Sequence, residues 1–284
     1  MAMTPSSTAQ AARQGIAARL RELRLDAGLN GQQLSSRCGW SPAKTSRLEA
    51  AKHLPSDADI RAWCEACGAG DESDELVAAS RTADEMYVEW RRKERTGLRR
   101  LQESTVPLYR RTRRFRTYAT GVIPGLVQTE RYAAALLDAI AEFRGIRNDA
   151  QEAARSRVAR SQVMRRRGTV TALLMEEDAL HQGFGGPDVL VEQLDYLVEV
   201  MALPNVSLGV IPRQVARRMW PVETFMIFDE DRAGVELLSA DVTITAPAEL
   251  TLYLRAFASL SRCAVYGNEA RALIDQAARA LSAD

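Results

Sequence analysis

The sequence predicts an α+β protein, in which an all-helical N-terminal domain is followed by a mixed α/β domain. Residues 30–49, NGQQLSSRCGWSPAKTSRLE, have the pattern of two short helices joined by a tight turn. After about residue 105, short apolar runs typical of strands alternate with helical stretches. The 284 residues suffice for two domains with separate cores.

We divide the chain into four segments on these patterns. They are a flexible N-terminal arm at 1–12, a helix-turn-helix domain at 13–80, a helical connector at 81–104 and a C-terminal effector or dimerisation domain at 105–284.

The first helix is expected at about 14–27, where Ile16, Leu20 and Leu23 recur at helical spacing. Gly28 ends it. A fourth helix begins after Ser56, a good N-cap, and ends before Gly68. An acidic turn then starts a longer helix over about 71–95. Its apolar stripe, which includes Tyr87 and Trp90, is typical of a core or a dimer seam.

Between these helices lies the helix-turn-helix pattern. Asn30 is a good N-cap for the second helix, and Gly39 permits the sharp reversal that follows. Ser41 is expected to cap the third helix, with Pro42 at its first position. Leu34, Thr45 and Leu48 are expected to point to the core, and the outer face of the third helix then carries Ala43, Lys44, Ser46 and Arg47.

In the second domain, residues 106–128 are expected to form strand and turn, interrupted at Pro124-Gly125. Further strands are expected at 169–175, 206–211, 224–229, 234–239 and 241–245. Helices are expected at 129–143, 149–167, 187–202, 247–265 and 268–281.

Residues 14–68 resemble an XRE-type, phage-repressor-like helix-turn-helix domain of five helices. The resemblance is carried by Leu34, Gly39, Trp40-Ser41, Ser46-Arg47-Leu48-Glu49 and Leu54-Pro55-Ser56. Three positions depart from it. Gly31 stands where the family often has a phosphate-binding Gln, Thr45 where an Ile is usual, and Ala50-Ala51 where an Asn-Gly turn is usual.

The second part of the chain also resembles a known domain, through GVIPGLVQTERYAAALL, GFGGPDVLVEQLDYLVEVMALPNVSLGVIP and residues 246–274. These are similar to a C-terminal domain of unknown function that follows an XRE head in actinobacterial, antitoxin-like regulators. The resemblance implies a dimeric transcription regulator, often encoded beside a small partner protein, whose C-terminal half senses or assembles.

A helix of this kind fits the major groove, and side chains near its N-terminus reach the bases. Arg47 suits the O6 and N7 atoms of guanine, and Ala43 the thymine methyl group. The DNA-binding residues predicted from the sequence are Gln32, Gln33, Ser41, Ala43, Lys44, Ser46 and Arg47. One alternative is a helical hairpin without a DNA role. For Arg47 alone, the alternative is an ion pair with Glu49 or another acid.

The net charge of +1 hides an asymmetry that agrees with a nucleic-acid partner. Residues 1–167 carry 30 Lys+Arg against 20 Asp+Glu, whereas residues 168–284 carry 8 against 17. Residues 91–116 hold eleven basic residues and two acids. A solvated arginine face is the alternative for any single Arg, but a basic half beside the predicted reading helix favours DNA.

Several other classes of protein are disfavoured. No apolar run is long enough to span a membrane, no secretory signal is evident, and the four cysteines form no disulfide framework, so we expect a cytoplasmic protein. Cys64 and Cys67 form a CxxC inside a predicted helix. Since a second pair is missing and only His53 and Cys38 are candidates for further ligands, we expect two core cysteines rather than zinc or a redox sensor. We expect no cofactor.

Catalysis is also disfavoured. The chain has two histidines and no nucleotide-binding or nucleophile-elbow motif. The best acid cluster is Glu176-Glu177-Asp178 followed by His181. A divalent-ion site of a nuclease is one interpretation of it, and a solvated strand end or helix N-terminus is the other. We expect the protein not to be an enzyme.

A loop after the strand at 206–211 combines charge with apolar bulk. It contains Arg213, Arg217, Arg218 and Trp220, and loops of this kind often carry function on a rigid support. An anionic ligand or an acidic partner is one interpretation, and a surface loop over a packed tryptophan is the other.

The sequence therefore predicts a sequence-specific DNA-binding regulator that acts as a homodimer on an inverted repeat in double-stranded DNA. The alternative is an antitoxin-like protein that mainly binds a small partner protein. A DNA-targeted enzyme is a third possibility, which would show metal-dependent turnover.

Overall fold

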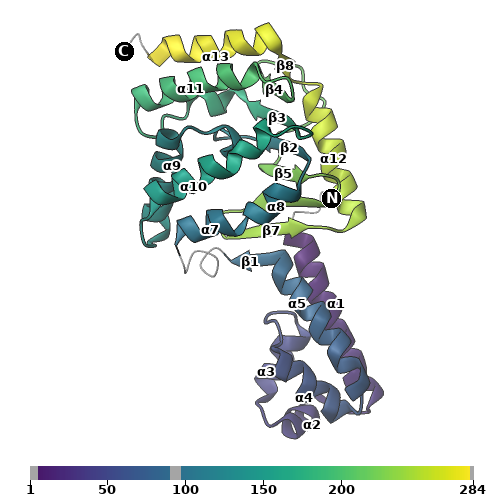
Figure 1. Ribbon diagram of the computed structural model, residues 1–284. Coiled ribbons are helices and arrows are strands. Elements are labelled where there is room, and N and C mark those ends of the chain that lie inside the picture. Colours follow the sequence, from purple (N-terminus) through teal and green to yellow (C-terminus); the bar gives the residue numbers. More distant parts are fainter. Residues whose placement is uncertain (1–5, 90–96, 282–284) are drawn as a thin grey trace. The chain divides into compact units, whose positions relative to one another are not determined.

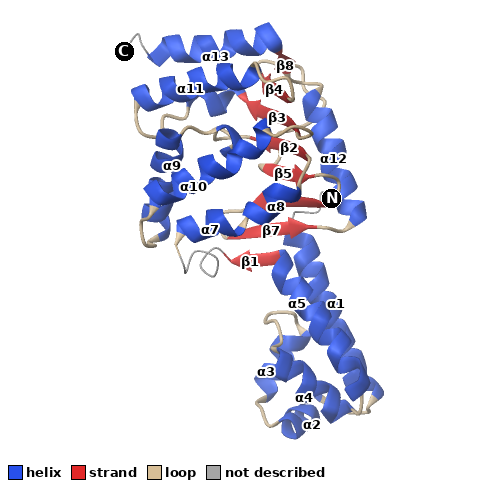
Figure 2. Ribbon diagram, viewed as in Figure 1, coloured by secondary structure: helices blue, strands red, loops and turns tan. Residues whose placement is uncertain are grey.

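The computed structural model describes residues 6–89 and 97–281, which divide into two compact units. The first unit comprises residues 1–88 and 240–243, and the second comprises residues 89–239 and 244–284. The predicted all-helical head and mixed second domain are confirmed (Figures 1 and 2). Within the described ranges, no helix combines the length and apolar character that crossing a membrane requires.

The head of the first unit has the five helices that the resemblance implied. They are α1 (Ser6–Asp26), α2 (Gly31–Cys38), α3 (Pro42–Glu49), α4 (Asp57–Cys67) and α5 (Ser73–Met86), with a 3-10 turn η1 (Gly70–Glu72) before α5. The same unit includes most of β1 (Tyr87–Glu89) and most of β7 (Ala240–Ile244), which are neighbours in the strand order.

Two boundaries in this unit differ from the prediction. The first helix begins at Ser6, so residues 6–12, which we expected as part of an arm, are helical. The helix expected at 71–95 ends at Met86 and is followed by β1. Trp90 and the rest of that prediction lie outside the described residues.

The helices of the head pack around one apolar core. Leu20, Leu34, Ile60 and Trp63 are each at most 1% exposed, and the Trp63 indole Nε1 donates to the Leu20 carbonyl oxygen at 2.8 Å. Burying that much apolar surface, with the indole N–H satisfied, holds α1, α2 and α4 together. This core is the support on which α3 is displayed.

The turn after α3 contains a residue in an unfavourable backbone conformation. Ala51 has φ 52°, in the left-handed region that an alanine Cβ disfavours, and its N–H bonds the Leu48 carbonyl oxygen. We expect Ala51→Gly to increase the free energy of unfolding by about 1 kcal/mol. Urea denaturation would measure this.

Ala50 is the matched control, because its φ of −84° suits any residue. Ala50→Gly should lower the free energy of unfolding by about 0.5–1 kcal/mol, through backbone entropy alone. If both substitutions destabilise the protein to the same extent, strain at Ala51 is not the cause.

The second unit is built on a mixed sheet. Its strands are β2 (Arg114–Ala119), β3 (Val170–Glu176), β4 (Val206–Ile211), β5 (Phe225–Phe228), β6 (Arg232–Glu236) and β8 (Val265–Tyr266), in the order β6-β5-β2-β3-β4-β8. β2, β3 and β4 are parallel, with Phe115 opposite Thr171 and Ala172 opposite Ser207. The pairs β2–β5, β5–β6 and β4–β8 are antiparallel.

Helices cover both faces of this sheet (Figure 1). On one face, Phe115, Leu173 and Leu208 join a core with α9 (Glu130–Arg144), α11 (Pro187–Met201) and α13 (Gly267–Leu281). On the other face, Phe225 contacts Tyr253 of α12 (Pro247–Ser261). α7 (Leu98–Ser104) and α10 (Ala150–Ser161) pack against each other beside α9. The described ranges also contain the short helices α8 (Val106–Arg111), η3 (Gly125–Val127), η4 (Gln162–Arg165) and η5 (Glu177–His181).

Most predicted strands and long helices of this unit are observed within a few residues of the expected positions. One exception is the segment after residue 105, where α8 precedes β2 and we expected only strand and turn. Another is the helix expected at 247–265, which ends at Ser261 and is followed by the unpredicted strand β8. Pro107 lies in the first turn of α8, where its missing N–H removes no helical hydrogen bond.

Candidate nucleic-acid interface

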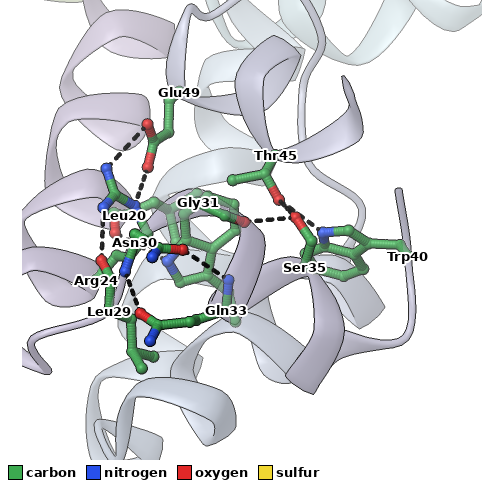
Figure 3. Close-up of polar contacts among 11 residues, drawn as sticks. Leu20, Arg24, Leu29, Asn30, Gly31, Gln33, Ser35, Trp40, Thr45 and Glu49 are labelled. Atoms are coloured by element: carbon green, nitrogen blue, oxygen red, sulfur yellow. Dashed lines mark hydrogen bonds and ion pairs between the residues drawn. The ribbon is translucent and has the colours of Figure 1, made fainter. Parts of the chain in front are cut away.

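The two helices of the helix-turn-helix begin and end near the predicted residues, but the side-chain cap predicted for Ser41 is not observed. The Asn30 side chain accepts from the Gln33 N–H at 2.9 Å, and the Gln33 side chain accepts from the Asn30 N–H at 2.8 Å, which forms a capping box (Figure 3). Gly39 ends α2 with φ 72°. Ser41 is the N-cap of α3, but its side chain makes no capping hydrogen bond. The Ser41 hydroxyl therefore stays available to a ligand.

A buried polar cluster fixes how α3 is rotated about its own axis. The Thr45 Oγ1 atom lies 2.7 Å from the Ser35 Oγ atom and accepts from the Trp40 Nε1 at 2.9 Å (Figure 3). Ser35 in turn donates to the Gly31 carbonyl oxygen at 2.6 Å. Thr45 is 2% exposed and Leu48 is 3% exposed, as predicted. The threonine that replaces the usual Ile thus ties α3 to α2 by hydrogen bonds.

A buried ion pair holds the other end of α3. The Arg24 guanidinium donates to both Glu49 carboxylate oxygens, at 2.6 and 3.2 Å, and to the Leu29 carbonyl oxygen at 2.7 Å (Figure 3). The side chains are 9% and 18% exposed. Glu49 therefore pairs with Arg24, and the alternative in which it pairs with Arg47 is wrong. Arg24 follows Leu20 by one helical turn on the inner face of α1, and this spacing was the signal in the sequence.

With these internal contacts made, the outer face of α3 is left to solvent. Ala43, Ser46 and Arg47 are exposed, and neither Ser46 nor Arg47 has a side-chain hydrogen bond or ion pair within the described part of the chain. An unpaired guanidinium on an exposed short helix is suited to base edges and phosphates.

Lys44 is placed differently from its neighbours on α3. Its Nζ atom donates to the Asp59 Oδ1 atom and lies 4.5 Å from the centre of the Trp40 ring. Burial raises the pKa of Asp59, but hydrogen bonds from Lys44 and Ser56 outweigh burial and lower the pKa below its ordinary value. The Lys44 charge is thus held against α4 and is less available to DNA than the sequence indicated.

This pair gives a prediction. Asp59→Asn should release Lys44 and strengthen non-specific DNA binding by a few fold, because one more free cation can neutralise a phosphate. Because the folded-state pKa of Asp59 is lowered, the pair stabilises the protein above the unfolded carboxyl pKa of about 4 and loses this effect as the pH falls through the folded-state pKa.

Fluorescence anisotropy with a random duplex would measure the binding, and urea denaturation at pH 3 to 7 would measure the stability. Lys44→Met is the matched control, since it removes the same pair without freeing a cation. Unchanged binding by Asp59→Asn would show that the lysine already reaches DNA.

The structure gives the two predicted glutamines different roles. Gln33 is used in the capping box, whereas Gln32 is exposed and without a partner in the described ranges. Gln32, Ser46 and Arg21 are among the residues that line a shallow hollow of about 650 Å³. Arg21 is exposed and unpaired among the described residues, and the sequence analysis missed it. Its position on the polar side of α1 was the available signal.

The comparisons with known proteins agree with this division of the chain. Residues 16–76 match a helix-turn-helix domain, and residues 102–276, more than half of the chain, match the domain of unknown function DUF5753. The chain belongs to the DUF5753 family. The predicted combination of a helix-turn-helix head with a C-terminal domain of unknown function is confirmed. A comparison with curated proteins gives no match.

In this member of the DUF5753 family, the cysteines of the head lie in or beside its core. Cys64 is buried, and Cys38 and Cys67 are partly buried. Burial raises the pKa of Cys38 to about 11 and raises the pKa of Cys64 and of Cys67. Among the residues that the structure describes, no three His, Cys, Asp or Glu side chains are arranged to hold a metal ion.

Inside the DUF5753 domain, two arginines of the candidate partner loop are bound by the domain itself. The Arg217 guanidinium donates to both carboxylate oxygens of Glu176, which also accepts from the Tyr118 hydroxyl at 2.7 Å. The Arg213 backbone N–H and side chain donate to Glu177 and Asp178 at 2.8 and 2.6 Å.

The acid cluster of the sequence analysis therefore anchors this loop. Arg218 and Trp220 remain exposed, and Trp220 is 62% exposed, so it is not packed beneath the loop. His181 is exposed at the end of η5. Of the four residues predicted for partner binding, Arg218 and Trp220 keep free side chains.

Proposed function

We propose that this DUF5753-family protein is a sequence-specific DNA-binding transcription regulator that acts as a homodimer on an inverted repeat. The observation that carries the proposal is the outer face of α3. Arg47 and Ser46 are exposed and unpaired among the described residues, while Thr45, Leu48 and Glu49 of the same helix are fixed inside the head. Such a helix can enter a major groove without rearrangement.

The individual contacts follow from the chemistry of each side chain. Arg47 is assigned to guanine through O6 and N7, and Ala43 to a thymine methyl group. Ser41, whose hydroxyl caps nothing in α3, Ser46, Gln32 and Arg21 are assigned to phosphate oxygens. These residues surround one exposed helix, so they can act together on one half-site.

The homodimer is proposed on energetic grounds. A single head of this size buries only about 600–1,000 Å² on DNA, which gives weak binding. Two heads related by a two-fold axis double the contacts and require half-sites about 34–36 Å apart, one helical turn of DNA. The DUF5753 domain is proposed to dimerise or to sense a ligand or partner. No catalytic step is part of the proposal.

The test is selection of bound fragments from the source genome with the purified full chain, followed by salt titration of the best fragment. We expect one enriched inverted repeat, and an affinity whose logarithm falls linearly with the logarithm of the salt concentration. Sedimentation of the complex should show two chains per repeat. Enrichment of no sequence over the input would refute sequence-specific binding.

A second candidate function is favoured by Arg218 and Trp220. An exposed tryptophan beside an exposed arginine, on a loop anchored by Arg213 and Arg217, is typical of a protein-binding surface. The protein would then bind a partner protein as its main role. This predicts a stoichiometric complex on co-purification that survives Arg47→Ala and is lost in Trp220→Ala. Loss of the complex in both variants, or in neither, would argue against it.

A further inference from the structure

Two arginines on α10 are largely enclosed without a carboxylate partner. The Arg157 guanidinium donates to the side-chain oxygens of Gln102 and Gln128, at 3.3 and 2.7 Å. Arg160 donates to the Thr105 Oγ1 atom and lies 4.2 Å from the centre of the Tyr109 ring. Within the described part of the chain, neither arginine forms an ion pair. Buried charges in proteins are usually paired with an opposite charge.

The electrostatic consequences are visible at both residues. Burial, together with the charge of the neighbouring Arg160, lowers the pKa of Arg157 to about 10, and Glu236 opposes this only in part. The Nε atom of Arg160 is buried without a hydrogen-bond acceptor. The charge of Arg160 would be stabilised by an anion at ion-pairing distance, which the described residues do not supply.

A pocket of about 230 Å³ lies beside Arg160, between α7, α8 and α10. Its polar lining consists of Arg160, Arg110, Ser156 and Glu103, and its apolar wall includes Val106 and Val163. Glu103, the one acid in this lining, is bound by Arg99 at 2.8 Å. The lining therefore has a net positive charge and contains, in Ser156, a hydroxyl without a partner among the described residues.

We propose that this pocket binds a small oxyanion group, with Arg160, Arg110 and Ser156 as the groups that contact it. Arginine donors match the oxygen spacing of phosphate and carboxylate groups, and the volume holds one such group with a short apolar part. If the DUF5753 domain senses a ligand, as proposed above, this site identifies the class of ligand as small anions with a phosphate or carboxylate group. The inference rests on the proposed function only for its biological meaning, because the site is tested without DNA.

The test is isothermal titration of the full-length, DNA-free protein with inorganic phosphate, and separately with acetate, against sodium chloride of equal ionic strength. We expect saturable binding of at least one of the two anions. Arg160→Gln and Arg110→Gln should each weaken it at least tenfold. Arg165→Gln, which removes an exposed charge from nearby η4, is the matched control and should leave the affinity unchanged.

A variant that binds the anion more tightly distinguishes a change in the site from a loss of the fold, because unfolding cannot increase the affinity. Glu103→Gln removes the carboxylate from the pocket lining, so the affinity for the anion should increase by a few fold. Arg110 is exposed, so Arg110→Gln tests the site even if Arg160→Gln unfolds the domain. Absence of saturable heat with both anions, an equal loss in Arg165→Gln, or weaker binding by Glu103→Gln would overturn the proposal.

Discussion

Arg47→Ala is expected to weaken binding to the selected repeat by about 1–3 kcal/mol for each half-site, or roughly 5- to 150-fold. Binding to random duplex should weaken only slightly, since the loss of one cation affects a single phosphate contact. The difference arises because an exposed, unpaired guanidinium on α3 can bond guanine through two atoms at once. Anisotropy titrations of both duplexes at matched salt would measure the two affinities.

Arg61→Ala is the matched control for Arg47→Ala. Arg61 lies on α4 and forms an exposed ion pair with Asp74, so its removal changes the net charge equally without touching α3. It should leave both affinities within about twofold. If Arg47→Ala weakens specific and random binding equally, Arg47 is a phosphate contact and the specificity must lie elsewhere.

Glu49→Ala is expected to destabilise the head by about 3–5 kcal/mol. The substitution leaves Arg24, whose side chain is 9% exposed, as a buried cation with only the Leu29 carbonyl oxygen as an acceptor. It also frees the end of α3, so specific DNA binding should fall with stability. Urea denaturation followed by tryptophan fluorescence would report the change, since Trp40 and Trp63 lie in this unit.

Two further variants separate loss of charge from loss of the fold. Glu22→Ala removes an exposed partner of Arg19, which keeps its second partner Glu72, and should cost less than about 1 kcal/mol. The double variant Arg24→Met with Glu49→Leu removes both charges and should recover most of the stability. A Glu49→Ala protein as stable as the unsubstituted one would show that the pair does not hold α3.

Local signals explain why the head was largely predictable from the sequence. Asn30, Gly39 and Ser56 act through hydrogen bonds or backbone angles within a few residues, and the structure shows each at its predicted cap. The ion pairs were not predictable in the same way. Arg24 lies 25 residues from Glu49, and Lys44 lies 15 residues from Asp59, so each pair depends on how the helices pack.

In the second unit, contacts between residues far apart in the sequence were even harder to predict. Its apolar runs indicated most strands, but nothing in them gave the strand order β6-β5-β2-β3-β4-β8. Arg213 and Arg217 looked like free cations in the sequence, because their acidic partners lie 35 to 41 residues earlier in the chain. The basic pocket beside Arg160 was missed for the same reason, since α7, α8 and α10 meet only in the folded domain.

The central claim, that α3 reads guanine through Arg47, is tested most directly by a double-substitution cycle between protein and DNA. Each guanine of the selected repeat is replaced in turn by 7-deazaguanine, which lacks the N7 acceptor, and affinities are measured for the unsubstituted and Arg47→Ala proteins. We predict non-additive losses, with a coupling of about 1 kcal/mol or more, at one guanine in each half-site. Strictly additive losses at every guanine would contradict the claim.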